Sequence, residues 1–210
     1  MAHTSDADLL VLHALRVRGL AEHHHISEST GLSEFAVSDY LAEAAAALVT
    51  HRDGRMSGWT LTPAGRAAHA ARLREERTAA ACDEEVRRGY ERFVDANGDL
   101  KILCTDWQLR SVGGQLLPND HTDASYDQAI AARLSAFHAG VAPVVDGLAE
   151  ALSRFAPYRP RLAGAVARFA AGEGEALARP LTGSYHDVWM ELHQDLLLTL
   201  DRERSAADGH

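Results

Sequence analysis

The stretch GWTLTPAGRAAHAARL, from Gly58 to Leu73, decides the expected fold because it changes from one regular structure to another within a few residues. Residues 56–61 have the pattern of a short β-strand. Thr62 is a good N-cap, and Pro63 suits the first helical position, where its missing N–H is not needed. The stretch therefore predicts a strand that ends at Leu61 and a helix that begins at Pro63 and runs into the 70s.

The residues before this stretch predict three helices and the first strand of a β-hairpin. Apolar residues recur at helical spacing over residues 8–19, a shorter helix follows, and a third covers residues 34–49. Ser33 stands at the N-cap position of the third helix. A strand near residues 50–52 and an Asp-Gly turn then lead into the second strand. Three helices, a two-stranded hairpin with a charged tip and a fourth helix form the pattern of a winged helix-turn-helix.

The second half of the chain is helical in pattern. Two helices are expected on either side of Asn97-Gly98, and residues 111–124 form the one long irregular segment. An apolar stripe over residues 125–152 and two further helical segments follow, the last of them over residues 180–200. The pattern predicts a helical bundle.

These patterns predict a mainly α protein of two domains. Residues 1–78 form the winged helix-turn-helix with its two-stranded β wing, and residues 79–210 form an all-helical C-terminal domain. The chain carries a formal net charge of -9, which works against general affinity for nucleic acid. It has two cysteines, no apolar run of membrane-spanning length and no secretory signal at its start, so we expect a cytoplasmic protein without a membrane partner.

The segment GLSEFAVSDYLAEAAAALVTHRDGRMSGWTLTPAGR, residues 31–66, resembles the corresponding part of MarR-type transcriptional regulators. The likeness extends over residues 8–73, about a third of the chain. It includes the glycine-leucine-serine turn, the recognition helix, the wing and a strand that ends in leucine-threonine-proline-x-glycine. The resemblance implies a dimeric regulator that binds double-stranded DNA.

The chain as a whole is similar to actinobacterial MarR-like proteins with a helical C-terminal domain. The segments that carry this likeness include RDGRMSGWTLTPAGR, CTDWQLR, NDH and SYHDVWMELH. Comparable segments accompany pyruvate phosphate dikinase-like enzymes, which use phosphoenolpyruvate. Because the chain has no phosphoenolpyruvate site of its own, that second likeness implies an accessory role.

The residues expected to contact DNA lie on the predicted recognition helix and the wing. They are Ser33, Ser38, Tyr40, Arg52 and Arg55. The helix itself carries three carboxylates and no lysine or arginine, which opposes binding to a polyanion. Two interpretations stay open: a DNA-binding regulator, or a degenerate winged helix that binds a protein partner.

Aromatic, acidic, thiol and imidazole side chains gather in three C-terminal segments. The candidate ligand-binding residues are Cys104, Asp106, Trp107, Asp120, His121, Tyr185, His186, Trp189 and His193. Apolar walls with a few polar groups are typical of a small-molecule pocket, although core histidines bonded to carboxylates would give the same pattern. No metal or cofactor is predicted, because two histidines seven residues apart on one helix cannot share an ion without distortion.

Helical geometry also assigns faces to the charged and histidine residues. On the last helix, His186 and His193 should point into the bundle, whereas Asp195 and its charged neighbours should face solvent. The run His23-His24-His25 is expected to be a solvated face, since consecutive helical residues point about 100° apart.

The leading hypothesis is a cytoplasmic, dimeric MarR-type regulator whose C-terminal domain senses a small-molecule effector. A second hypothesis is an accessory module that binds another protein through its winged helix. A third is a small enzyme that uses one or more of Cys104, Asp106, His121, His186 and His193.

Overall fold

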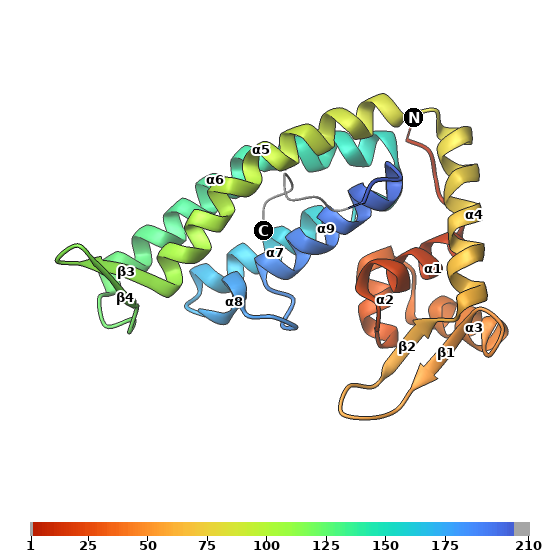
Figure 1. Cartoon of the computed structure of the whole chain (residues 1–210), viewed down its shortest axis with the longest axis horizontal. Helices are drawn as coiled ribbons and strands as arrows, with labels where there is room; N and C mark the ends of the chain where they lie inside the picture. The colour runs from red at the N-terminus through yellow and green to blue at the C-terminus, as the bar shows by residue number, and fades with distance from the viewer. Residues whose placement is uncertain (1, 204–210) are drawn as a thin grey trace.

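The computed structural model describes residues 2–203, and it is mainly helical with two small antiparallel hairpins (Figure 1). In the first part of the chain the elements are α1 (Ala7–Arg18), α2 (His23–Thr30), α3 (Glu34–Ala44), β1 (Val49–Arg52), β2 (Gly58–Leu61) and α4 (Pro63–Ala80). In the second part they are α5 (Asp83–Gln108), β3 (Leu109–Val112), β4 (Gln115–Pro118), α6 (Ala124–Ala151), η1 (Ser153–Phe155), α7 (Tyr158–Ala170), α8 (Glu175–Ala178) and α9 (Tyr185–Thr199).

Local capping chemistry sets the limits of the first helices, as the sequence predicts. The Thr62 hydroxyl accepts a hydrogen bond from the Gly65 N–H at 3.0 Å, and Pro63 opens α4. Ser33 caps α3 in the same way. Gly19 and Gly31 follow α1 and α2 with positive φ, which glycine adopts without strain. The predicted order of three helices, a hairpin and a fourth helix is confirmed, although α3 ends at Ala44.

Two clusters of buried apolar side chains define two units of the molecule. One cluster, built from residues between Val11 and Leu61, lies among α1, α2, α3 and the β1–β2 hairpin. The other, built from residues between Cys82 and Leu197, lies among α5, α6, α7, α8 and α9. We refer to residues 2–80 as the N-terminal unit and to residues 82–203 as the C-terminal unit.

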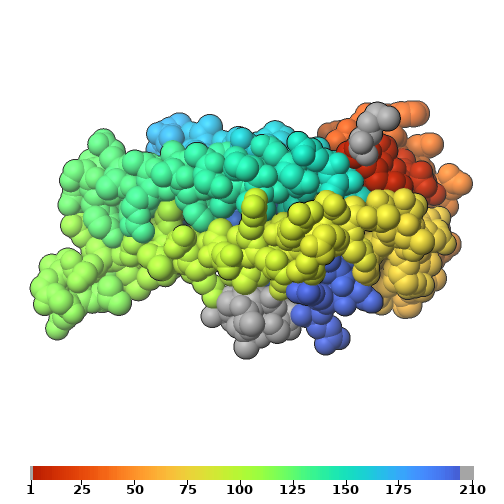
Figure 2. Space-filling model, turned by 90° about the horizontal axis from the view of Figure 1, so that it is seen from above, coloured from red at the N-terminus to blue at the C-terminus, as the bar shows by residue number. Residues whose placement is uncertain are grey.

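The C-terminal unit is long and narrow. Helices α5 and α6 run side by side along its whole length, as the space-filling view of Figure 2 shows. Helices α7 and α9 pack beneath them, and the β3–β4 hairpin stands at the end far from the N-terminal unit.

Two predictions for the C-terminal unit are wrong. It is not all helical, because residues 109–118 form the β3–β4 hairpin, with a turn at Gly113 and Gly114 (φ 59° and 84°) that favours a tight hairpin. Helix α5 is also not interrupted at Asn97-Gly98. Asn97 is buried and its side-chain oxygen accepts a hydrogen bond from the Trp189 indole at 2.9 Å, so packing against α9 holds the helix continuous.

Candidate functional site

The residues expected to contact DNA lie at the α3 and β1–β2 end of the N-terminal unit. Arg52 and Arg55 of the hairpin and Ser38 of α3 are exposed. The Ser33 hydroxyl accepts a hydrogen bond from the Ala36 N–H, so it serves as the α3 cap. The Tyr40 hydroxyl is buried and has no hydrogen-bond partner among residues 2–203. It is therefore turned away from the surface on which the other four residues lie.

The exposed side of α3 is acidic and carries one large apolar side chain. Glu34, Asp39 and Glu43 are all exposed on this helix. Phe35 is 82% exposed at its first turn. Positive charge on this surface thus comes from the hairpin arginines rather than from α3.

The nine candidate ligand-binding residues fall into separate groups, and the first lies in the core of the C-terminal unit. Trp189 stacks on Phe93 with ring centroids 4.2 Å apart, and its N–H is bonded to Asn97. Tyr185 and His193 are buried in the same core, and His186 is half-buried. The inward orientation predicted for these residues is confirmed for Tyr185, Trp189 and His193, which pack among other side chains.

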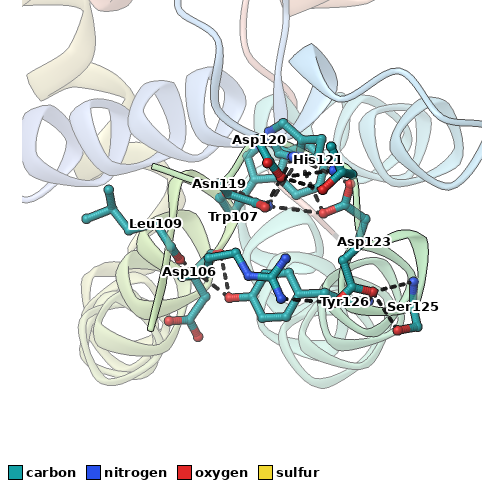
Figure 3. A network of polar contacts seen from close by, with 12 residues as sticks. Asp106, Trp107, Leu109, Asn119, Asp120, His121, Asp123, Ser125 and Tyr126 are labelled. Carbon is teal, nitrogen blue, oxygen red and sulfur yellow. Dashed lines mark hydrogen bonds and ion pairs between the residues drawn. The ribbon is translucent and has the colours of Figure 1, made fainter. Parts of the chain in front are cut away.

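The second group surrounds the base of the β3–β4 hairpin (Figure 3). Asn119 donates hydrogen bonds to the Trp107 carbonyl and the Asp127 carboxylate, each at 3.1 Å. His121 Nδ1 lies 3.1 Å from the other Asp127 oxygen, and its ring lies on Trp107 with centroids 4.1 Å apart. These contacts fasten the hairpin to the start of α6.

Two carboxylates of this second group are engaged locally as well. Asp106 pairs with Arg133 at 2.7 Å, and its backbone carbonyl accepts a hydrogen bond from the Tyr126 hydroxyl. Asp120 accepts hydrogen bonds from the N–H and hydroxyl of Thr122, which lower the pKa of its carboxyl. The group is a set of structural contacts around a loop.

The two groups do not form one pocket. Trp107 lies ten residues beyond Asn97 on α5, a separation of about 15 Å along the helix axis. Cys104 lies between them, half-buried, and burial raises the pKa of its thiol to about 11. A thiol with that pKa stays protonated at neutral pH, which does not support a role as nucleophile.

A groove of about 1370 Å³ lies between the two units, and none of the nine candidate residues lines it. Residues of α2 and of the end of α1 line one side, and residues of α7, α9 and the segment before α9 line the other. Figure 1 shows where these helices lie. Its volume exceeds the roughly 300–1,000 Å³ that is typical of small-molecule sites. The prediction that His23-His24-His25 is simply a solvated face is wrong in part, because His24 and His25 line this groove and His25 is half-buried.

A buried polar network lies next to the groove and joins the units. Arg154 donates to Glu76 at 2.9 Å and to Thr199 at 2.5 Å, and it also binds Asp195. His13 Nε2 lies 2.9 Å from Asp195. Arg154, Glu76 and Asp195 have side chains that are 2–3% exposed. The network thus connects α1 and α4 with η1 and α9.

Asp195 is the clearest error among the predicted helix faces. It was expected in solvent, yet it is buried and accepts a further hydrogen bond from the Tyr158 hydroxyl at 3.0 Å. Burial opposes its ionisation, but Arg154 and His13 outweigh burial and hold the pKa of this carboxyl far below its ordinary value. An ionised, fully bonded carboxylate is therefore part of the contact between the units.

The same network predicts a loss of stability in acid. His69 Nε2 lies 2.9 Å from His13 Nδ1, and burial followed by the charge of His13 lowers the pKa of His69 to about 3. In the unfolded chain the imidazole of His69 binds a proton near pH 6.5, whereas in the folded chain it does so only near pH 3. The neutral, buried imidazole therefore contributes its full stability above pH 6.5, and this contribution is lost as the pH falls from 6.5 toward 3. Between pH 7 and 4 we expect His69 to account for about 3 kcal/mol of lost unfolding free energy.

Urea unfolding of the wild type and of His69→Gln at pH 7, 6, 5 and 4 measures this contribution. The variant should show the shallower decline, because glutamine does not titrate. His24→Gln, a change at an exposed histidine, is the control and should follow the wild type. Parallel curves for the wild type and His69→Gln would contradict the assignment.

The described residues contain no group of three or more His, Cys, Asp or Glu side chains arranged to hold a metal ion. Within residues 2–203 there is also no helix long and apolar enough to cross a membrane. Comparison with known proteins finds no family model, curated protein or solved structure that matches the chain.

The sequence analysis predicts neither the groove nor the buried network. Only His13 has a signal in the sequence, because it follows Leu9 by four residues and so lies on the buried, apolar face of α1. Arg154 and Asp195 gave no such signal, because their pairing joins segments 41 residues apart. The groove exists only once the two units are packed together.

Proposed function

We propose that the protein is a winged helix-turn-helix regulator that binds double-stranded DNA mainly through its wing. The arrangement that carries this proposal is the sequence of α2, a left-handed Gly31 and α3, followed by the β1–β2 hairpin with two exposed arginines. In such domains the second helix of the turn reads bases in the major groove and contacts with phosphates supply affinity. Among residues 2–203, helices α5 to α9 lie away from the α3 and hairpin end (Figure 1).

The charges on this surface define the kind of binding to expect. Three exposed carboxylates on α3 repel phosphate, so Arg52 and Arg55 supply the charge-assisted contacts. Ser38 is available for a hydrogen bond to a base or phosphate. The protein is therefore a weak binder of general DNA, and specific binding is confined to low salt or to a narrow set of sites. Two copies of the chain in a dimer would bind two DNA half-sites that lie about one turn of the duplex apart.

Replacing both Arg52 and Arg55 with alanine should weaken DNA binding for all sequences alike. Each lost phosphate contact removes about 0.9 from the slope of log affinity against log salt, so the double variant should lose up to about 1.8. Fluorescence anisotropy with a labelled duplex, titrated at several salt concentrations, measures both quantities.

A matched control uses Arg74 and Arg92, which are exposed on α4 and α5. Replacing both with alanine changes the net charge equally but should leave the salt slope within the error of the wild type. Equal salt slopes for the wing variant and the wild type would show that Arg52 and Arg55 do not contact DNA.

The groove supports a regulatory role for the C-terminal unit. A ligand held there would contact α2 and the α7–α9 wall together, so its binding energy would depend on how the two units sit against each other. Such a ligand would alter the placement of the helix-turn-helix in a dimer.

Phe35 favours a second candidate function, a winged helix that docks on a protein. An aromatic side chain that is 82% exposed, beside acidic residues, suits a protein interface better than a DNA backbone. Selection of binding sites from random duplexes separates the two functions. Enrichment of a palindrome supports the regulator, whereas no enrichment with a Phe35-dependent protein complex supports the docking module.

A further inference from the structure

The start of helix α2 lies against the β1–β2 hairpin. The chain just before α2 exchanges two backbone hydrogen bonds with β2, from the Ala21 N–H to the Trp59 carbonyl at 3.0 Å and from the Trp59 N–H to the Ala21 carbonyl at 2.8 Å. The Ser57 hydroxyl also donates to the Glu22 carboxylate at 2.7 Å. These contacts fix the first turn of α2 beside the hairpin that carries the two wing arginines.

Histidines from α2 and from β1 meet at this contact. The centroid of the His23 ring lies 6.0 Å from that of Trp59, and the centroid of the His51 ring lies 5.3 Å from it. His24 is exposed on the same turn of α2, and the His51 side chain is 35% exposed. We refer to His23, His24 and His51 as the histidine cluster.

Two carboxylates face the histidine cluster. The Ser57 hydrogen bond, and then the charges of the three histidines, lower the pKa of the Glu22 carboxyl. Asp53 Oδ1 lies 3.2 Å from His51 Nδ1. Both carboxylates favour the protonated form of an imidazole beside them.

His25, the next residue of α2, lies in a different environment. Burial, and then the charge of Arg18 on α1, lower the pKa of its imidazole. The charge of Glu28 acts in the opposite direction but does not outweigh them. His25 therefore does not belong to the histidine cluster.

At neutral pH the surface around the histidine cluster is negative. Among the described residues of α3, the hairpin and the start of α2, the side chains charged at this pH are five carboxylates and two guanidinium groups: Glu22, Glu34, Asp39, Glu43, Asp53, Arg52 and Arg55. Histidine side chains gain a positive charge as the pH falls from about 8 to 5. Three added charges would bring positive and negative groups to equal number on a surface that otherwise repels phosphate.

We propose that the histidine cluster is a proton-dependent part of the DNA surface, in which protonated His23, His24 and His51 bind backbone phosphates beside the contacts of the wing arginines. In a helix-turn-helix the first helix of the pair crosses the phosphate backbone, and helix N-termini are among the groups that contact phosphate. Helix α2 is that first helix here, so its first turn lies where the backbone is expected. The inference rests on the proposed function and makes its affinity rise as the pH falls.

Fluorescence anisotropy with a labelled duplex of mixed sequence, at pH 7.5 and 5.5 and at several salt concentrations, tests the proposal. The wild type should bind at least about tenfold more tightly at pH 5.5. Its salt slope should steepen by up to about 2.7, since each phosphate contact adds about 0.9. Replacing all three cluster histidines with glutamine should remove most of both changes. An equal rise in affinity in this variant and the wild type would overturn the proposal.

Replacing the three cluster histidines with arginine tests the same surface without acid. At pH 7.5 this variant should bind at least about tenfold more tightly than the wild type, and its affinity should change by less than about threefold between pH 7.5 and 5.5. A matched control carries Gln128→Arg, Ala132→Arg and Ala136→Arg on the exposed face of α6. It should stay within about threefold of the wild type at pH 7.5. Equal tightening in both arginine variants would indicate a general charge effect and overturn the proposal.

The four proteins also separate this inference from the proposed function. Binding that rises in acid in the wild type and the α6 control, but not in the two cluster variants, supports both. A wild type that binds the duplex equally at pH 7.5 and 5.5 keeps the proposed function and rejects the role of the histidine cluster. If none of the four proteins binds a duplex at either pH, the proposed function is rejected together with the inference.

Discussion

Replacing Arg154 with methionine is expected to lower the free energy of unfolding by about 3–5 kcal/mol, the largest effect of any single substitution considered for this protein. The guanidinium is buried and holds two carboxylates, Glu76 through Nε and Asp195 through Nη1. Without it, both carboxylates stay out of water, with His13 as the nearest basic group to Asp195. A buried charge that loses its partner costs far more than the pair contributes when intact.

Urea-induced unfolding of the wild type and of Arg154→Met measures this loss. Arg159→Met is a matched control, since Arg159 pairs with Asp146 at 3.1 Å and both side chains are more than a third exposed. An exposed pair contributes about 0–1 kcal/mol, so the control should remain close to the wild type. Equal stability of the two arginine variants would show that the network does not hold the units together.

A third variant separates charge from packing. Adding Glu76→Gln and Asp195→Asn to Arg154→Met removes the uncompensated charges, so part of the lost stability should return. If the triple variant is no more stable than Arg154→Met, the loss comes from the missing side-chain contacts instead.

Local signals in the sequence predict the N-terminal helices, whereas contacts between distant segments, such as those of the network, could not be predicted. The helices of the N-terminal unit begin and end at local signals, such as the Ser33 and Thr62 caps and the glycines after α1 and α2. These signals act over three or four residues, so they can be read without knowing the fold. The contact of Asp195 with Arg154 depends on how α9 packs, and its polar character alone pointed to solvent.

The errors in the C-terminal unit have the same origin. The sequence predicts a break at Asn97-Gly98, because an exposed glycine inside a helix costs about 1 kcal/mol. The 26 residues of α5 make enough contacts with α6 and α9 to outweigh that cost. The sequence analysis predicts an irregular segment over residues 111–124, although Gly113-Gly114 between two short segments is a hairpin signal that accounts for β3 and β4.

The candidate site was harder to predict than the fold. Tyr185 and Trp189 were correctly oriented toward the interior, but periodicity cannot distinguish a packed core from a pocket wall. Arg18, Arg161 and Glu191 come from three helices, and each looks like an ordinary surface charge in its own segment. Only the packing of the two units brings them onto one groove floor.

Gly65, in the stretch that decides the fold, gives the second large effect. Thr62 Oγ1 donates to the Ala47 carbonyl at 2.8 Å, and the Thr62 N–H donates to the Leu48 carbonyl at 3.0 Å. These bonds bring the first turn of α4 directly onto the chain before β1. A methyl group at Gly65 would overlap the backbone carbonyl of Leu48, which the Thr62 bond holds in place. The glycine after threonine-proline-x is thus required by the approach of two backbones.

Gly65→Ala should therefore lower the free energy of unfolding by about 3 kcal/mol, even though alanine is the better helix former. Gly98→Ala is the matched control, because that glycine lies inside α5 with no atom within 4 Å of an added methyl group. There the helix propensity acts alone and should raise the stability by about 0.5–1 kcal/mol. Urea unfolding of both variants gives opposite signs for one chemical change. A stabilising Gly65→Ala would mean that α4 can move away from Leu48, and the close approach would then not account for glycine at this position.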